Sequence, residues 1–265
     1  MNGFNKENKV NLNNILMCPK CLGSEFTTSE SNLKCNICKK IVQIKPKYKT
    51  FIFEKLYEAK EKSVGAFIPK LDNRPKNWRE LNYLEIKKWL IGVDKNKLII
   101  DLGCGRLTNS FLLSEHKCIY IDGADFDQVD VVCDFEKKLP FKNKSIDCIL
   151  LSNVLEHIYD PKNLFIEIYR VLKDDGECMA LIPFAIQHHQ EPYDYNRYTR
   201  HYLKRVSIES GFQKIFIKEI GSISNIMEPL LRLDAKQKKY QLSMKASIKN
   251  NLLSLIKKFN YFLYR

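Results

Sequence analysis

The feature that most constrains this chain is an apolar run that ends in an acid and a glycine turn. Residues 97–102 are almost entirely apolar and include Asp101, and Gly103 and Gly105 follow directly. Residues 107–112 then carry apolar side chains at helical spacing. This order predicts a strand, a tight turn and a helix. Glycine lets backbone N–H groups approach a ligand closely, and a helix N-terminus favours a polar or anionic group.

Further acids stand at the ends of the next predicted strands. Residues 118–121 form a second apolar run that ends in Asp122, whose carboxylate can take the two hydroxyls of a ribose. Asp134 precedes Phe135, and a further apolar strand follows at residues 148–151. Open α/β sheets bind ligands outside the carboxyl ends of their strands. The pattern therefore predicts a ligand site at that edge of the sheet.

Taken in order, these motifs resemble the class I S-adenosylmethionine-dependent methyltransferases. The resemblance covers roughly residues 78–221 and implies a Rossmann-like, doubly wound α/β sheet that binds S-adenosylmethionine. The motifs are Asp-Leu-Gly-Cys-Gly at 101–105, Ile-Asp-Gly at 121–123, Asp-Phe-Glu-x-x-Leu-Pro-Phe at 134–141, Leu-Glu-His at 155–157 and Glu-Ile-Tyr-Arg-Val-Leu-Lys-x-x-Gly at 167–176. The residues implied for the cofactor are Asp101, Gly103, Cys104, Gly105, Asp122, Gly123, Asp134, Phe135 and Asn153.

One position departs from the family pattern. The family often has a third glycine two residues after Gly105, where this chain has Leu107. We expect a side chain there to crowd the approach of the cofactor. The departure leaves open a degenerate domain that serves only as a binding module.

Two Cys-x-x-Cys pairs stand near the beginning of the chain. Each pair can place two thiolates on one metal through a tight turn, and four thiolates complete a closed tetrahedral zinc site. Segments 25–28 and 41–44 supply the strands of a small hairpin. We predict a structural zinc ribbon, with redox or incidental motifs as the alternative. The four predicted ligands are Cys18, Cys21, Cys35 and Cys38.

Charge and composition add constraints on partners. The chain is 45% hydrophobic and 28% charged, which is typical of globular proteins. Nine cysteines, with no apolar leader in residues 1–15, favour the cytoplasm. The net charge of +13 is uneven, because residues 1–75 and 228–265 carry +7 each and residues 76–227 carry −1. A solvated lysine-rich surface and contact with the phosphates of nucleic acid or of a membrane both fit the flanks.

The organisation follows from these segments. Residues 242–265 have the pattern of a basic amphipathic helix, which predicts packing on the protein or peripheral contact with an anionic membrane. The predicted parts are a zinc ribbon at 1–45, a linker with a helix near 51–60 at 46–75, the methyltransferase domain at 76–227 and a C-terminal helical extension at 228–265. Other predicted elements are helices at 75–90, 163–172 and 200–210 and strands at 178–182 and 214–219.

The loop at residues 183–199 is expected to cover the acceptor side of the cleft. Its pattern His-x-x-Pro-Tyr-Asp-Tyr-x-Arg-Tyr-Thr at 189–199 resembles methyltransferases of bacterial surface-glycan clusters. Tyrosine rings suit sugars, and an arginine suits a phosphate or carboxylate. A loop held together by packing and by an Asp194–Arg197 pair is the alternative. The predicted acceptor-binding residues are His188, Tyr193, Asp194, Arg197 and Tyr198.

The chemistry implied is an in-line displacement of a sulfonium methyl group, for which the enzyme mainly supplies proximity. A sugar hydroxyl also needs a base, and a histidine that titrates near neutral pH suits that role. His157 and His189 are the candidates. We expect no catalytic metal, because the cysteine site is closed and no second acidic cluster is evident.

These inferences predict O-methylation of a sugar or of a sugar-linked, phosphoryl-type group in bacterial capsule or lipopolysaccharide biosynthesis. The acceptor would be a glycan, a nucleotide-sugar or a lipid-linked sugar. Methylation of rRNA or tRNA is the main alternative. The basic flanks favour it, and so does the ribbon, which resembles small zinc ribbons that activate RNA methyltransferases. The neutral central region makes nucleic acid the less favoured partner.

Overall fold

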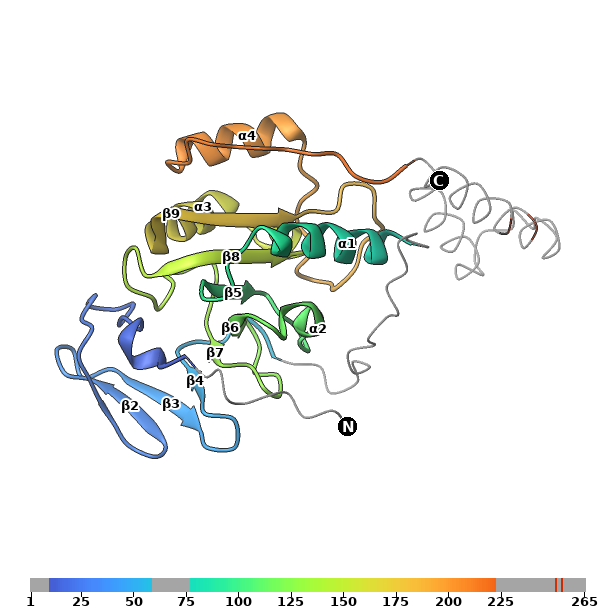
Figure 1. Ribbon diagram of the computed structural model, residues 1–265. Coiled ribbons are helices and arrows are strands. Elements are labelled where there is room, and N and C mark those ends of the chain that lie inside the picture. The colour runs from blue at the N-terminus through green and yellow to red at the C-terminus, as the bar shows by residue number, and fades with distance from the viewer. Residues whose placement is uncertain (1–9, 59–76, 223–250, 252–253, 255–265) are drawn as a thin grey trace.

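The computed structural model describes residues 10–58, 77–222, 251 and 254, and these residues build one mixed sheet flanked by helices (Figure 1). The strands run in the order β1-β2-β3-β4-β7-β6-β5-β8-β9. Their bounds are β1 Phe26–Thr28, β2 Asn32–Cys35, β3 Ile41–Lys45, β4 Thr50–Ile52, β5 Leu98–Leu102, β6 Lys117–Asp122, β7 Val131–Val132, β8 Ile146–Ser152 and β9 Leu172–Leu181.

Strand β5, at the centre of the parallel half of the sheet, is buried on both faces. All five residues of β5 are buried, as expected for a strand covered by helices on either side. Ile99 packs with Ile86 of α1 on one face, whereas Ile100 packs with Leu164 and Ile168 of α3 on the other. The chain is therefore doubly wound, as predicted. The helices are α1 Trp78–Ile91, α2 Ser110–Leu113, α3 Pro161–Val171 and α4 Arg200–Glu209, with short 3-10 turns η2 Leu12–Asn14 and η3 Leu155–His157.

The beginnings of the helices follow capping rules. The Asn77 side chain accepts from the N–H of Glu80 at the start of α1, and the Asp160 side chain accepts from the N–H of Lys162 at the start of α3, where Pro161 occupies the first turn. The Thr199 side chain accepts from the N–H of Tyr202 and begins α4. The helices predicted near 75–90, 163–172 and 200–210 are thus confirmed.

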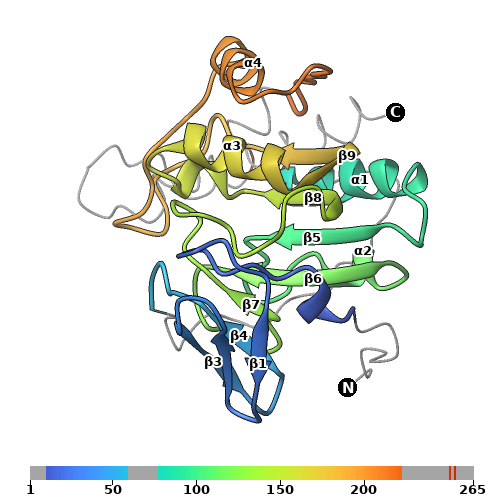
Figure 2. The same ribbon diagram turned by 90° about the vertical axis from the view of Figure 1, so that its left-hand side faces the viewer.

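The four N-terminal strands form an antiparallel meander that continues the parallel sheet (Figure 2). Its last strand pairs with β7 in parallel, so that Phe51 stands beside Val131 and Ile52 beside Val132. Phe51 and Phe53 are buried in the same core as strands β5 and β8. The meander is therefore an integral edge of the nine-stranded sheet.

Several expectations need correction. No helix occurs over residues 51–58, because residues 51 and 52 are taken into β4 beside β7. Residues 214–219 form no strand and lie beyond α4 without ladder pairing. Strand β9 begins at Leu172, directly after α3, because Leu172 pairs with Ile146 across an irregularity in the ladder. The predicted C-terminal helix at 242–265 lies outside the described residues, apart from positions 251 and 254.

The structure also bears on membrane insertion. Among the residues that it describes, no helix is long and apolar enough to cross a membrane.

Candidate functional site

The predicted turn after β5 lies at the carboxyl edge of the sheet, beside the end of β6. The N–H of Gly105 donates to Asp122 Oδ2 at 2.7 Å, and Gly103 and Gly105 have φ values of 81° and 56°. A Cβ on Gly103 would lie 2.4 Å from a methyl carbon of Val154. Glycine at 103 is therefore required by packing as well as by backbone conformation.

Asp122 is buried, and both of its carboxylate oxygens accept hydrogen bonds. It is 2% exposed, and its Oδ1 accepts from the Tyr57 hydroxyl at 2.7 Å and from the N–H of Ala124 at 3.0 Å. Burial raises the pKa of Asp122 despite these bonds. Tyr57 follows the N-terminal meander, and the N–H of neighbouring Leu56 donates to the Gly123 carbonyl at 2.8 Å. Sequence reasoning missed Tyr57, because no local pattern brings it to a strand end so distant in sequence.

Leu107 occupies its unusual position without crowding the turn. Its φ is 58°, the left-handed conformation that explains a glycine in related chains. Its side chain is 7% exposed and packs with Cys104, Val129 and Val132. The side chain thus packs in a buried cluster, and the expectation that Leu107 crowds the cofactor's approach stays a prediction. Cys104 belongs to the same cluster.

The remaining predicted cofactor residues have mixed surroundings. Asp101 is fully buried beside the Asn109 side-chain amide, 3.3 Å away, and burial raises its pKa to about 7. Asp134 accepts from the N–H of Glu136. Phe135 is a core residue, 3% exposed, and its assignment to the cofactor site also stays a prediction. Asn153 follows β8 with a φ of 57°. The site assignments for Asp101, Asp134 and Asn153 stay predictions.

Three side chains that converge after β8 form what we term the acceptor cluster: Glu156, His157 and His189. Glu156 Oε1 lies 3.6 Å from His157 Nε2 and 3.8 Å from His189 Nε2. The two imidazole rings meet edge to face with centroids 4.8 Å apart. Glu156 is completely buried, which raises its pKa to about 7, and burial lowers the pKa of His157. The two predicted catalytic histidines therefore do come together, around a carboxylate that sequence reasoning passed over.

Hydrogen bonds hold the loop at residues 183–199, which we term the acceptor loop, against η3. His157 Nδ1 lies 2.8 Å from the Tyr193 carbonyl, and the N–H of Tyr195 donates to the Glu156 carbonyl at 2.8 Å. The Tyr198 hydroxyl donates to the Leu155 carbonyl at 2.9 Å. Tyr198 is 8% exposed, so its hydroxyl is used within the protein rather than presented to an acceptor.

The predicted anion-binding arginine is paired inside the loop. Both terminal nitrogens of Arg197 contact the Asp194 carboxylate, at 2.7 and 2.9 Å, and this partner holds the pKa of Asp194 well below its usual range. Asp194 also accepts from the N–H of His189. The structure thus shows the Asp194–Arg197 pair that was the alternative reading of this loop, and its effect is to position His189.

Exposed tyrosines surround the acceptor cluster. Tyr193 is 37% exposed, Tyr195 43% and Tyr159 73%, and the rings of Tyr159 and Tyr195 meet edge to face at 5.6 Å. The Tyr193 ring also packs against Tyr57 at 5.9 Å. This contact connects the acceptor cluster to Asp122. His188, the remaining predicted acceptor residue, is exposed.

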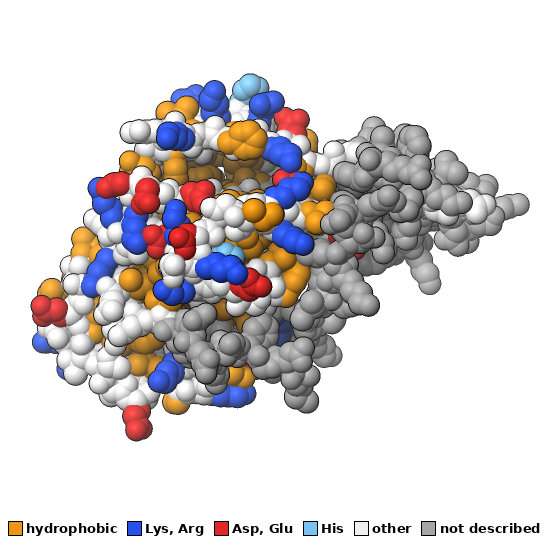
Figure 3. Space-filling model, in the orientation of Figure 1, with side chains coloured by type: hydrophobic (Ala, Val, Ile, Leu, Met, Phe, Trp, Pro, Cys, Tyr) orange, Lys and Arg blue, Asp and Glu red, His pale blue; other side chains and the backbone are white. Residues whose placement is uncertain are grey.

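A groove separate from the acceptor cluster lies on another part of the domain. Its volume is about 820 Å³, and it lies between β9, α4 and residues 214–222. Figure 3 shows hydrophobic side chains gathered beneath α4 on this face. The groove reaches the start of the acceptor loop at residues 183–186 but includes none of the acceptor cluster.

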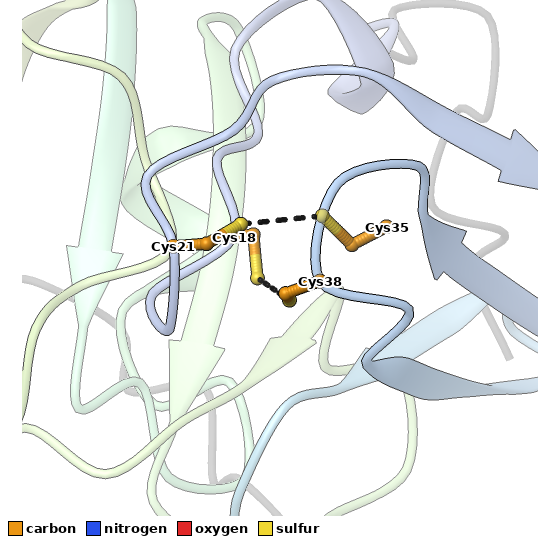
Figure 4. Close-up of side chains that lie close together, drawn as sticks. All are labelled: Cys18, Cys21, Cys35 and Cys38. Carbon is orange, nitrogen blue, oxygen red and sulfur yellow. Dashed lines mark hydrogen bonds between the residues drawn. The ribbon is translucent and has the colours of Figure 1, made fainter.

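The four N-terminal cysteines form a second constellation, which we term the cysteine cluster (Figure 4). All four sulfur atoms lie within 4.8 Å of one another, with Cys18 3.6 Å from Cys38 and Cys21 3.5 Å from Cys35. The spacing predicted this meeting of Cys18, Cys21, Cys35 and Cys38.

Two equivalent turns build the cysteine cluster. The N–H of Leu22 donates to the Cys18 carbonyl, and the N–H of Lys39 donates to the Cys35 carbonyl, at 2.8 and 3.0 Å. Leu22 and Lys39 have φ values of 65° and 60°. Each Cys-x-x-Cys pair is therefore held by the same tight turn, closed by a left-handed residue.

Comparison with known proteins bears on the motif region. Residues 100–180 match the family model of a methyltransferase domain. Cycloartenol-C-24-methyltransferase 1 of Oryza sativa subsp. japonica is 30% identical over 120 residues, which are 38% of this chain and 35% of that protein. An uncharacterised protein of Methanocaldococcus jannaschii is 31% identical over 115 residues, 39% of this chain and 49% of that one. The chain thus spans about a third to a half of these curated relatives.

Among solved structures, the [4+2]-cyclase SpnF is similar with a TM-score of 0.50 and 15% identity, over 76% of this chain and 82% of that one. This likeness shows a shared fold. The family match covers the predicted motifs from residue 101 to residue 176.

Proposed function

We propose that this chain transfers a methyl group from S-adenosylmethionine to an oxygen atom of a sugar or sugar-linked acceptor. The observation that carries the proposal is the link between Asp122 and the acceptor cluster. Tyr57 bonds Asp122, its ring packs on Tyr193, and the Tyr193 carbonyl lies at hydrogen-bonding distance from His157. A cofactor group and an acceptor group can therefore meet at one edge of a methyltransferase domain.

The residues at this edge fit the cofactor. Asp122 is a buried carboxylate that now accepts a hydroxyl hydrogen bond from Tyr57, and a ribose hydroxyl is a donor of the same kind. Asp122 and the turn at 103–105 would hold the nucleoside end. When bound, the cofactor supplies an electrophilic methyl group and a good leaving group.

The acceptor cluster supplies what a sugar hydroxyl lacks. As the hydroxyl oxygen bonds to the methyl carbon, the sulfur–carbon bond breaks, and the sulfur keeps the electron pair. The hydroxyl proton passes to the cluster, where the Glu156 carboxylate oxygens and His157 Nε2 have no hydrogen-bond partner among the described residues. A positioned base of this kind contributes about 10²–10⁴ in rate.

The rim around the cluster favours a sugar over RNA. Tyr159, Tyr193 and Tyr195 present rings with a polar tip, which suit contact with a sugar face and its hydroxyls. On the face shown in Figure 3, basic and acidic side chains of the described residues are intermixed rather than gathered in one basic stripe. RNA-binding enzymes depend strongly on phosphate neutralisation. A glycan, nucleotide-sugar or lipid-linked sugar is therefore the proposed acceptor.

For the cysteine cluster we propose one structural zinc ion. Two sulfur ligands of a tetrahedral zinc ion lie about 3.8 Å apart, given a zinc–sulfur distance of about 2.3 Å. The observed separations of 3.5 and 3.6 Å fit that requirement. Four sulfur ligands leave no open position, so this ion would stabilise the meander.

The test offers the purified protein radiolabelled S-adenosylmethionine with glycan precursors in one reaction and undermodified ribosomal RNA in another. We expect label on the sugar, and none on RNA. At subsaturating S-adenosylmethionine, Asp122→Ala should lower the labelling, whereas His201→Ala, at an exposed histidine on α4, should not. Efficient labelling of RNA at one nucleotide with no labelled sugar would overturn the proposed acceptor.

A further inference from the structure

The acceptor cluster brings together three atoms that can each accept a hydrogen bond or bind a metal ion: Glu156 Oε1, His157 Nε2 and His189 Nε2. His157 Nδ1 faces the Tyr193 carbonyl at 2.8 Å, and His189 Nδ1 faces the Gln187 carbonyl at 3.2 Å. A carbonyl oxygen can only accept, so each Nδ1 carries the proton, and in the neutral ring each Nε2 carries a lone pair. Both lone pairs are near Glu156 Oε1, at 3.6 and 3.8 Å.

Burial of these atoms without hydrogen-bond donors costs free energy unless a cation binds between them. Glu156 is 0% exposed, and neither of its carboxylate oxygens has a hydrogen-bond partner among the described residues. The same holds for His157 Nε2. Buried acceptors left unpaired cost roughly 1–3 kcal/mol each, and more when they are charged. A positive charge at their common point would satisfy all three atoms at once.

The separations suit a metal ion. The donor atoms of Glu156, His157 and His189 all lie within 4.8 Å of one another. Two ligands of one tetrahedral ion with bonds of about 2.1 Å lie about 3.4 Å apart. The two observed distances from Glu156 Oε1 exceed this value by only a few tenths of an ångström. Small side-chain rotations would therefore complete the coordination.

The supporting contacts are those that metal-binding histidines use. Each ring is oriented from its other nitrogen by a backbone carbonyl, which fixes the tautomer that can coordinate. The carboxylate of Asp194 lies 3.4 Å from His189 Nδ1 and accepts from the His189 N–H, and Arg197 holds Asp194 in turn. His189 thus has both of its supports within the loop.

We propose that Glu156, His157 and His189 bind one divalent transition-metal ion, distinct from zinc at the cysteine cluster. Two imidazoles and one carboxylate suit Fe²⁺, Mn²⁺, Co²⁺, Ni²⁺ or Zn²⁺ and leave coordination positions open. This proposal departs from the expectation of no catalytic metal, which was based on the closed cysteine site and on no second acidic cluster being evident in the sequence. His189 is 26% exposed at its side chain, so the site is reachable from solvent.

Binding of the ion does not depend on the proposed methyl transfer, but its role does rest on it. With the ion in place, the cluster would activate the acceptor oxygen by coordination. The hydroxyl proton would then be released to water at lower pH instead of passing to Glu156 or His157, and the methyl carbon would bond to the oxygen as its bond to sulfur breaks. Neither an oxidant nor a reductant is needed.

The experiment titrates purified protein, its cysteine cluster loaded with zinc, with CoCl₂ and with MnCl₂ in separate calorimetric runs. Zinc content is measured before and after, so that exchange at the cysteine cluster is detected. Cobalt spectra identify the ligands, because thiolate charge-transfer bands appear only if cobalt enters the cysteine cluster. We expect one equivalent of Co²⁺ beyond the zinc, without thiolate bands.

Variants assign the ion to the three residues. His189→Ala and Glu156→Gln should weaken Co²⁺ binding about 100-fold or more, because a ligand is lost outright. His201→Ala is the matched control and should bind normally. Thermal unfolding checks that each variant is folded, and the partly exposed His189 makes its variant the safer one. No uptake by the unmodified protein, or equal uptake by the folded His189→Ala variant, would overturn the proposal.

The outcome is separable from the proposed function. Uptake of Co²⁺ without methyl transfer to any sugar would support the metal site and count against the acceptor. Methyl transfer by protein that takes up neither ion would support the function and reject the metal site.

Discussion

The cysteine cluster and the acceptor cluster differ in how the chain brings their side chains together. The cysteine cluster draws four identical ligands from two copies of one turn, within residues 18–38. The acceptor cluster joins adjacent residues of η3 to a histidine on a separate loop. The cysteine cluster offers four sulfur ligands, which fill a tetrahedral site, whereas the acceptor cluster offers three ligand atoms. A closed set of ligands is typical of a structural metal site, and a set with an open coordination position is typical of a site that exchanges water or substrate.

The difference also shows where charge is tolerated. At the cysteine cluster four thiolates would share the charge of one divalent ion, whereas the buried Glu156 lies within electrostatic reach of Arg197 and Asp194. Tyr57 follows β4 of the meander and contacts both Asp122 and Tyr193. The predictions below test whether the two clusters have separate roles.

The largest expected effect is that of Cys35→Ser. Structural zinc in small domains binds with roughly 10 kcal/mol or more of apparent free energy, so loss of one ligand should release the metal and unfold the meander. Because β4 pairs with β7, we also expect weaker cofactor binding. Metal analysis measures the loss of zinc, limited proteolysis the unfolding of the meander, and calorimetry the affinity for the cofactor.

The matched control for that variant is Cys178→Ser on β9, outside the cysteine cluster. It should keep zinc and resist proteolysis within residues 10–58. Full zinc content in Cys35→Ser would show that the cluster is not the metal site.

The second effect concerns turnover. His157→Ala should lower the turnover number about 10²–10⁴-fold, because the acceptor loses the group that activates it. Zinc content, the melting temperature and affinity for S-adenosylmethionine should change little. Steady-state kinetics with His201→Ala in parallel give the comparison. A variant that turns over normally would remove His157 from the chemistry and leave the acceptor cluster without a catalytic role.

A smaller effect is expected at Asp122. Asp122→Ala removes a buried acceptor of hydroxyl hydrogen bonds and should weaken S-adenosylmethionine binding by about 1–3 kcal/mol. Binding calorimetry on the folded variant is the measurement. Unchanged affinity would move the cofactor away from β6. Metal binding at both clusters should persist, since neither includes Asp122.

The smallest effect, and the one of opposite sign, is that of Tyr57→Phe. Its hydroxyl donates to Asp122 at 2.7 Å, where it competes with a ribose hydroxyl. Removing it should strengthen cofactor binding by up to about 1 kcal/mol, the usual net value of one hydrogen bond. Asp122→Ala combined with Tyr57→Phe should show no such gain. Weaker binding in the single variant would mean that Tyr57 supports the cofactor instead.

The two clusters explain what the sequence could predict. The cysteine cluster and the strand–turn–helix at residues 98–113 depend on local spacing, and both were predicted. Glu156 could not be singled out from the sequence, because its proximity to His189 depends on the folding of a loop that lies more than 30 residues further along the chain. Strand β4 was mistaken for helix, because its partner β7 has only two residues and lies far along the chain. Tyr57 depends on the same long-range pairing.

The pairing of β4 with β7 has a practical consequence for dividing this protein. A fragment that starts at residue 76 would leave β7 as a bare sheet edge, with Val131 and Val132 deprived of their neighbours Phe51 and Ile52. Unprotected edges of this kind promote association between chains. Such a fragment should be recovered as aggregates, and fusion partners or crystallisation efforts are better placed on chains that retain residues 10–58.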